Sequence, residues 1–385
     1  MDKKEIGLYV HIPFCKSKCI YCDFCSFDNK EGKKTEYLEM LKKEINLYSD
    51  VVKDCIIKTL FIGGGTPTIL TCDELKDLIS EIKKNFKFKK DFEFTVEANP
   101  GTLDIDKLKT LKECGVNRLS IGLQSANDFT LKTLSRIHTF EEFKKNVEDA
   151  REVGFTNINA DIMFSLPNET IKDIKHTVEE VLKLNLEHIS AYSLIIEEGT
   201  RMYDMACSED SKYVFPDEDT DREIYYYICD TLKEHGYHQY EISNFAKPGY
   251  ESKHNIIYWR AEEYLGLGLA AHSYLNNYRF SNVIDMNRYI SKLRDENKIT
   301  YLHGKKELES KNDQISEFMF LGLRMLDGIS IKEFKERFGV DIDDVYGSII
   351  SEMIEDGVME REDDTIKLTR RGIDVSNVIF AEFMQ

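Results

Sequence analysis

The chain contains three cysteines spaced closely enough to bind one inorganic cluster. Cys15, Cys19 and Cys22 follow one another at intervals of four and three residues, directly after the apolar run 6–13. Three thiolates at this spacing can ligate three irons of a [4Fe–4S] cube, which leaves the fourth iron without a protein ligand. The amino and carboxylate groups of S-adenosylmethionine can chelate such an iron. A reduced cluster can then pass an electron to the sulfonium and release a carbon radical.

Other roles for these cysteines fit the sequence less well. A zinc site usually contains a second pair of ligands downstream, and the sequence shows no such pair. A structural disulfide is disfavoured because the three cysteines are bunched and the sequence shows no secretory signal. Five further cysteines are scattered along the chain, and we interpret them as reduced thiols: Cys55, Cys72, Cys114, Cys207 and Cys229.

Composition narrows the classes of protein to which the chain can belong. Its 385 residues carry a formal net charge of −18. This acidic balance argues against nucleic acid as a main partner, because phosphates require a basic surface. No apolar run approaches the ~18 residues that would indicate a membrane-spanning helix. We therefore expect a cytoplasmic protein of one large domain with an appendage, or of two to three domains.

Short β-type segments alternate with helical segments in the first half of the chain. Strands are predicted at 7–12, 59–62, 93–97, 118–123, 159–164 and 188–194, and helices at 37–51, 73–86, 105–114, 140–153 and 171–184. Six alternations predict a parallel sheet but are too few for a closed eight-stranded barrel. We therefore predict an α/β fold with a partial (β/α)6 barrel. Sites in such barrels lie at the carboxyl ends of the strands, where the cysteine loop falls.

The pattern changes after residue 196. A long helix is predicted over 217–236, an aromatic- and glycine-rich mixed α/β segment follows, and the charged run 305–311 is interpreted as a linker. Helices at 330–338, 343–355 and 371–383 and a two-stranded ribbon at 358–368 resemble a winged-helix unit. Because the chain is acidic, we favour a lid or a protein contact over DNA binding for this unit. The predicted domains are 1–236, 237–304 and 305–385.

Glycines and polar residues stand at the ends of successive predicted strands. The run Gly63–Pro67 closes the second strand, and its glycines let backbone approach a ligand closely. Glu97 and Gln124 end the third and fourth strands, and Asp161 lies in the fifth. An unpaired polar side chain at a barrel mouth would be costly. The sequence therefore predicts a ligand-lined cavity at this end of the barrel.

These motifs together resemble the radical SAM superfamily. Within it, they are similar to the branch that contains oxygen-independent coproporphyrinogen III oxidase and the heme chaperone HemW. The resemblance rests on YVHIPFC at 9–15 with the two later cysteines, GGGTP at 63–67, EANPG at 97–101, SIGLQS at 120–125 and SRIH at 135–138. It implies a [4Fe–4S] cluster on the three cysteines. It also implies contacts to S-adenosylmethionine from Tyr9, Tyr21, Gly64, Gly65, Thr66, Glu97, Gln124, Arg136 and Asp161.

Three features favour the HemW side of this branch. The oxidase pattern has a further cysteine two residues after the third ligand, whereas Cys25 stands three residues after it. Only eight residues precede Tyr9, which leaves no room for the extension of the oxidase. The segment His254-Asn-Ile-Ile-Tyr258-Trp259 resembles the heme-binding HNxxYW motif. That resemblance implies an imidazole ligand to heme iron and two aromatic rings on the macrocycle, with His272 as a second candidate ligand.

The resemblance implies a radical SAM heme chaperone that delivers heme to acceptor hemoproteins of unknown identity. The alternative is oxygen-independent coproporphyrinogen III oxidase, which would begin with hydrogen abstraction by a 5′-deoxyadenosyl radical. A winged-helix sensor of iron or heme is disfavoured by the acidic charge. The resemblance further implies transient membrane contact. It leaves open whether the chain forms a homodimer and whether S-adenosylmethionine is cleaved, so its status as an enzyme also stays open.

Overall fold

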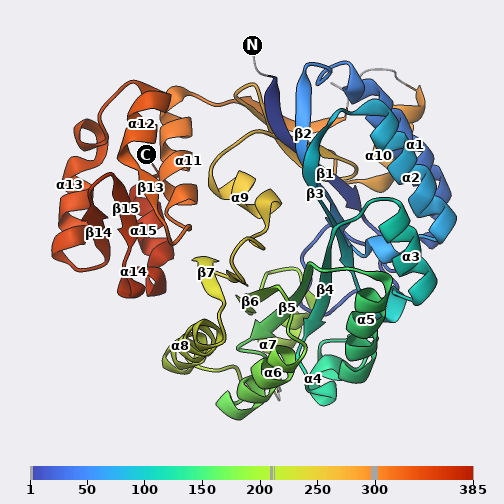
Figure 1. The fold of residues 1–385 in the computed structure, drawn as a ribbon, viewed down its shortest axis with the longest axis horizontal. Helices are drawn as coiled ribbons and strands as arrows, with labels where there is room; N and C mark the ends of the chain where they lie inside the picture. The colour runs from blue at the N-terminus through green and yellow to red at the C-terminus, as the bar shows by residue number, and fades with distance from the viewer. Residues whose placement is uncertain (1–2, 209–210, 212, 296–301, 385) are drawn as a thin grey trace.

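The computed structural model describes residues 3–208, 211, 213–295 and 302–384 (Figure 1). Its centre is a sheet in which six parallel strands follow one another in chain order. These strands are β1 (Lys4–Ile12), β2 (Cys55–Gly64), β3 (Phe88–Ala98), β4 (Arg118–Gln124), β5 (Ile158–Phe164) and β6 (His188–Ser193). The predicted α/β fold with a partial (β/α)6 barrel is confirmed.

Helices connect these strands and cover the outer face of the sheet. They are α1 (Lys34–Ser49), α2 (Cys72–Asn85), α3 (Ile105–Glu113), α5 (Phe140–Val153) and α6 (Ile171–Lys183), with the short α4 (Asp128–Thr133) and α7 (Arg201–Ala206) in loops. Local sequence fixes several of their ends. Thr71 and Thr139 form capping boxes at the starts of α2 and α5, and Gly154 ends α5 at a φ of 97°.

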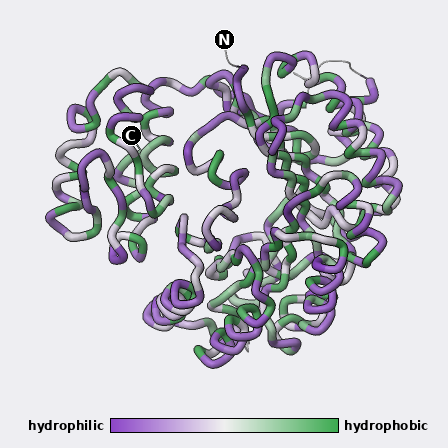
Figure 2. The backbone as a smooth tube through the Cα atoms, viewed as in Figure 1, coloured by the Kyte–Doolittle hydropathy of each residue, from purple (hydrophilic) through white to green (hydrophobic). Residues whose placement is uncertain are grey.

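The parallel strands are buried on both faces. In β1, Leu8 and Val10 on one face and Gly7 and His11 on the other are all buried, as expected for a parallel sheet that is packed on each side. Figure 2 shows hydrophobic residues concentrated in the strands and stretches of hydrophilic residues along the outer helices. None of the helices in the described part of the chain is long and apolar enough to cross a membrane.

Later segments extend the same sheet at both edges. After α8 (Glu218–Glu234), β7 (His238–Glu241) and β8 (Asn244–Ala246) join the β6 edge. At the other edge, β9 (Tyr264–Leu267) pairs in parallel with β1, and β10 (His272–Leu275), β11 (Tyr278–Asn282) and β12 (His303–Leu308) follow in antiparallel pairing. Helix α10 (Met286–Asp295) packs against α1.

The interpretation of residues 305–311 as a linker is wrong. Most of this charged run belongs to β12, and its last residue begins α11 (Lys311–Gly322). β12 lies at the edge of the sheet and its residues are largely exposed, so lysine and glutamate side chains can occupy a strand there. An edge strand of this kind lacks the apolar alternation on which the sequence interpretation depends.

The C-terminal residues form a compact unit with its own hydrophobic core, which includes Phe318, Phe334 and Phe338. Its elements after α11 are β13 (Ile329–Ser330), α12 (Ile331–Phe338), α13 (Ile342–Glu355), β14 (Met359–Glu362), β15 (Thr365–Leu368), α14 (Arg370–Asp374) and α15 (Ser376–Glu382). The single final helix predicted over 371–383 is instead two helices, because Val375 has non-helical dihedrals (φ −111°, ψ 20°). Figure 1 shows this unit beside the barrel, with α9 (Lys253–Trp259) between them. The domain boundaries remain predictions.

Candidate cofactor site

The three clustered cysteines line a pocket of about 150 Å³ at the carboxyl end of the barrel strands. Their loop is pinned at its base, because the Cys15 N–H donates to the Phe27 carbonyl at 2.9 Å. No three His, Cys, Asp or Glu side chains in the described ranges are placed to share one metal ion. Three closely spaced thiolates suit a group in which each thiolate binds its own metal atom.

Glycines bring the end of β2 against the cysteine loop. A Cβ atom on Gly65 would lie 2.7 Å from the Phe14 carbonyl oxygen and 3.0 Å from the Cys15 sulfur. Gly64 has a φ of 110°, and its N–H donates to the Glu97 carboxylate at 2.9 Å. Residues with side chains would not fit this backbone, so the glycines are required for the close approach of the two loops.

Arg136 supplies a buried positive charge to the same pocket. One of its terminal nitrogens lies 3.4 Å from the Cys19 sulfur, and the other donates to the Gly122 carbonyl at 2.6 Å. Its Nε is buried and has no hydrogen-bond partner among the described residues, and no carboxylate there forms an ion pair with it. A buried guanidinium without a counterion is costly. Arg136 is therefore suited to an anionic ligand group in the pocket.

Two carboxyl groups face the pocket, Glu97 from β3 and Asp161 from β5, the strands on either side of β4. Burial and, to a smaller extent, the nearby charge of Asp161 raise the pKa of Glu97 to about 7. Burial also raises the pKa of Asp161, which accepts hydrogen bonds from Asn159 at 2.8 Å and Ser120 at 3.2 Å. These carboxyl groups can accept hydrogen bonds from the hydroxyl or ammonium groups of a ligand.

The structure brings together all but one of the residues predicted to contact S-adenosylmethionine. Those that line this pocket with the cysteines are Tyr21, Gly64, Gly65, Thr66, Glu97, Gln124, Arg136 and Asp161. Sequence reasoning missed Ser120 and Gly122, which also line it. Alternation along β4 could have found them, because every second residue of a strand faces the same side as Gln124.

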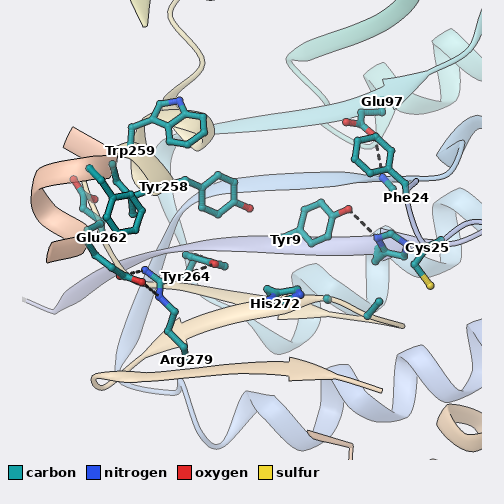
Figure 3. A pocket seen from close by; sticks show the side chains of 18 residues that line it. Tyr9, Phe24, Cys25, Glu97, Tyr258, Trp259, Glu262, Tyr264, His272 and Arg279 are labelled. Atoms are coloured by element: carbon teal, nitrogen blue, oxygen red, sulfur yellow. Dashed lines mark hydrogen bonds and ion pairs between the residues drawn. The ribbon is translucent and has the colours of Figure 1, made fainter. Parts of the chain in front are cut away.

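Tyr9 is the exception, because it lines a second and larger cavity of about 650 Å³. Figure 3 shows this cavity, whose walls come from β1, α9, β9–β11 and the first helix of the C-terminal unit. Its lining includes the large aromatic and aliphatic side chains of Phe24, Tyr258, Trp259, Tyr264, Phe320 and Leu321. Phe24, Gly64 and Glu97 line both cavities, so the two share a wall.

The residues of the HNxxYW segment divide between the cavity and the wall behind it. Tyr258 and Trp259 line the cavity, whereas His254 is only 1% exposed. The His254 Nδ1 lies 2.7 Å from the Thr59 hydroxyl, and its Nε2 lies 2.8 Å from the Tyr258 hydroxyl. Burial lowers the pKa of His254 to about 3, so the ring is neutral. His272, the second candidate, lines the cavity directly.

Comparison with known proteins identifies the family. The model of the radical SAM superfamily matches residues 9–181, and that of the HemN C-terminal domain matches residues 310–375. Heme chaperone HemW of Bacillus subtilis is 39% identical over 98% of both chains. The HemW of Lactococcus lactis is 37% identical over 100% of this chain and 98% of its own. The chain belongs to the HemW family.

Membership of the HemW family confirms the predicted resemblance. Coproporphyrinogen III oxidase (HemN) of Escherichia coli shares the fold with a TM-score of 0.87, covering 99% of this chain and 90% of that one. Its sequence is only 22% identical, so this likeness establishes the fold and not the reaction. The relatives named HemW match nearly the whole chain at 37–39% identity, so the oxidase alternative has less support than the heme chaperone.

Proposed function

We propose that the protein is a radical SAM heme chaperone, which carries heme in the larger cavity and a [4Fe–4S] cluster with S-adenosylmethionine in the smaller pocket. The observation that carries this proposal is the pair of adjoining cavities. One contains three cysteines and a buried arginine, and the other is large and aromatic. The curated relatives named heme chaperones match nearly the whole chain, so both cavities lie within the region of similarity.

The residues of the smaller pocket suit both groups. Cys15, Cys19 and Cys22 would hold the cluster, which supplies one-electron reduction of the bound sulfonium. Arg136 would pair with the methionine carboxylate, since its buried charge has no counterion among the described residues. The remaining predicted contacts would come from Tyr21, Gly64, Gly65, Thr66, Glu97, Gln124 and Asp161. Tyr9 lines the larger cavity, so it would contact S-adenosylmethionine from across the wall that the two cavities share.

The larger cavity suits a flat, mainly apolar ligand. Its volume of about 650 Å³ lies within the range of about 300–1,000 Å³ that is usual for small-molecule sites. Tyr258 and Trp259 would pack on the macrocycle, and His254 would hold the Tyr258 ring in place through its hydrogen bond. We further propose that the protein acts in the cytoplasm and passes heme to acceptor hemoproteins, with transient membrane contact. A homodimer is a further proposal.

The cluster assignment is tested by Cys19→Ala. This variant should lose the brown absorbance and the iron and sulfide of the cluster after anaerobic reconstitution, because one iron of the cube loses its ligand. Cys207→Ala is the matched control, since Cys207 is exposed and lies outside the pocket. A retained [4Fe–4S] spectrum in Cys19→Ala would refute the ligand assignment.

The choice between chaperone and oxidase is tested by anaerobic turnover. The reconstituted protein is incubated with coproporphyrinogen III, S-adenosylmethionine and a reductant, and product masses are measured. We expect no loss of carboxyl groups, together with stoichiometric hemin binding and transfer of hemin to an apo-hemoprotein. A product that has lost two carboxyl groups would establish the oxidase activity instead.

A further inference from the structure

We propose that His272 is the axial ligand of the iron when the larger cavity holds heme. This inference rests on the proposed heme-carrying function and assigns the iron to one residue of that cavity. It places the ligand outside the HNxxYW segment, whose histidine lies in the wall behind Tyr258. Three properties decide the ligand: the freedom of the His272 ring, the commitments of the other side chains, and the protonation of the imidazole.

The His272 ring is free, while its backbone is fixed. It is the first residue of β10 and pairs with Ser281 of β11. The next residue, Ser273, accepts a hydrogen bond from the Gly266 N–H at 2.9 Å. In contrast, the described residues provide neither ring nitrogen of His272 with a hydrogen bond or an ion pair. Figure 3 shows His272 among the residues that line the cavity, together with Tyr9 and Tyr264.

The other histidines near the cavity have no free nitrogen. The His11 Nδ1 lies 2.9 Å from the Tyr9 hydroxyl, and its Nε2 lies 2.9 Å from the Cys25 carbonyl. His254 is likewise bonded through both nitrogens and is fully enclosed. Either ring would have to break a buried hydrogen bond before it could bind iron, which costs about 1–3 kcal/mol for the group left unpaired.

Several oxygen atoms in the cavity that could bind iron are protonated or already belong to ion pairs. Burial raises the pKa of Tyr9 and of Tyr258 well above the usual value, so both phenols keep their protons. Glu262 forms an ion pair with Lys58, and Glu317 forms one with Arg279. A carboxylate that left its cation to bind iron would leave an unpaired charge at the cavity wall.

Cys25 is the remaining competitor. It lines the cavity, and its sulfur lies 3.8 Å from the Ile284 carbonyl oxygen. Burial raises the pKa of this thiol, so the thiolate form that binds iron is scarce at neutral pH. Thiolate and imidazole ligation of heme have different spectra, so experiment can separate Cys25 from His272.

The imidazole of His272 is in the correct protonation state. Burial and the positive charge of Arg279 lower its pKa, so the ring is neutral at pH 7 and keeps a lone pair on one nitrogen. Ligation forms a bond from this lone pair to the iron and displaces a water bound to free hemin. Neither partner is oxidised or reduced, so no co-reactant is required.

The experiment compares hemin binding to the wild-type protein, His272→Ala, His254→Ala and Cys25→Ser. Axial ligation is measured by absorption and by electron paramagnetic resonance. We expect His272→Ala alone to lose the imidazole signature and to bind hemin about tenfold more weakly or worse, and we expect added imidazole to restore the signature. Because the described residues form no hydrogen bond with the His272 ring, this variant should keep its circular dichroism spectrum and cluster content.

The outcomes separate this inference from the proposed function. An unchanged imidazole signature in His272→Ala, or its loss only in His254→Ala, would overturn the assignment while leaving the heme-carrying function intact. A thiolate signature that disappears in Cys25→Ser would assign the iron to that residue instead. Failure of the wild-type protein to bind hemin stoichiometrically would overturn the proposed function together with the ligand assignment.

Discussion

Gly65 shows how little space separates the end of β2 from the cysteine loop. An added methyl group would meet the Phe14 carbonyl oxygen at 2.7 Å and the Cys15 sulfur at 3.0 Å. Gly65→Ala should therefore push Cys15 out of position and lower the iron and sulfide bound after reconstitution to less than half of the wild-type content. The measurement is iron and sulfide analysis with the absorbance of the cluster.

Gly32→Ala is the control for this substitution, because nothing lies within 4 Å of the added methyl group. This variant should bind the cluster at the wild-type level. Full cluster content in Gly65→Ala would mean that the cysteine loop can move aside, and the claim of a required glycine would then fail.

Residue types and spacing predicted most of the smaller pocket, but not which cavity each residue faces. The cysteines, the glycine run and the polar strand ends are adjacent in space because parallel strands bring their carboxyl ends to one edge. Tyr9 stands near the shared wall and faces the larger cavity. His254 belongs to a motif, yet its ring points back toward Thr59 of β2. Such orientations depend on contacts between distant segments, which spacing along the chain does not encode.

At the scale of elements, α1 supports the turn that leads to His272. Glu44 of α1 is fully buried and accepts hydrogen bonds from the Gly268 N–H at 2.8 Å and from the Asn282 amide at 2.6 Å. It also accepts one from the Tyr289 hydroxyl at 2.5 Å. One carboxyl group therefore joins α1, the β9–β10 turn, β11 and α10.

This arrangement predicts a pH dependence of stability. Burial raises the pKa of Glu44 to about 7 from its ordinary value of 4.5, because its hydrogen bonds offset only part of the desolvation. The folded state therefore holds this proton more tightly than the unfolded state. The contribution of Glu44 to the free energy of unfolding should fall by about 3 kcal/mol as pH rises from about 4.5 to about 7.

The test is urea unfolding of the wild-type protein and Glu44→Gln at pH 5 and pH 8. The amide side chain of this variant cannot titrate, so the stability of the wild-type protein relative to the variant should decrease between the two pH values. Glu39→Gln, an exposed position on the same helix, should show no such trend. A stability difference that is independent of pH would contradict the assignment of the titration to Glu44.

Sequence periodicity predicted the central strands and long helices because their faces are uniformly buried or exposed. All six parallel strands were found, with ends that differ from the structure by a few residues. The failures lie where packing overrides the local pattern. β12 is a charged edge strand that is recognisable only through its partner β11, and the break at Val375 has no glycine or proline to mark it.

At the scale of the whole molecule, polar contacts hold the C-terminal unit against the segment that follows Trp259. Arg337 donates to the Ala261 carbonyl at 2.6 Å and to the Arg260 carbonyl at 3.2 Å. Arg260 in turn forms an ion pair with Asp327 at 2.6 Å. Because Phe320 and Leu321 of this unit line the larger cavity, its docking closes one wall of that cavity.

Arg337→Ala should therefore loosen this wall. We expect hemin to dissociate about fivefold faster, which corresponds to roughly 1 kcal/mol of lost hydrogen bonding, while the cluster content stays at the wild-type level. Stopped-flow transfer of hemin to apomyoglobin measures the rate. Arg361→Ala is the control, since Arg361 pairs with Asp343 inside the C-terminal unit. Equal rates in the two variants would show that docking of the unit does not limit release.

Because the two cavities share a wall, binding of a ligand in one cavity can change the affinity of the other cavity for its own ligand. Phe24 and Glu97 face both sides, so a ligand that displaces either residue on one side reshapes the other. Linkage requires reciprocity: the factor by which S-adenosylmethionine changes the affinity for heme equals the factor by which heme changes the affinity for S-adenosylmethionine. Under the proposed function, a coupling of this kind would make the affinity for S-adenosylmethionine differ between the heme-loaded and the heme-free protein.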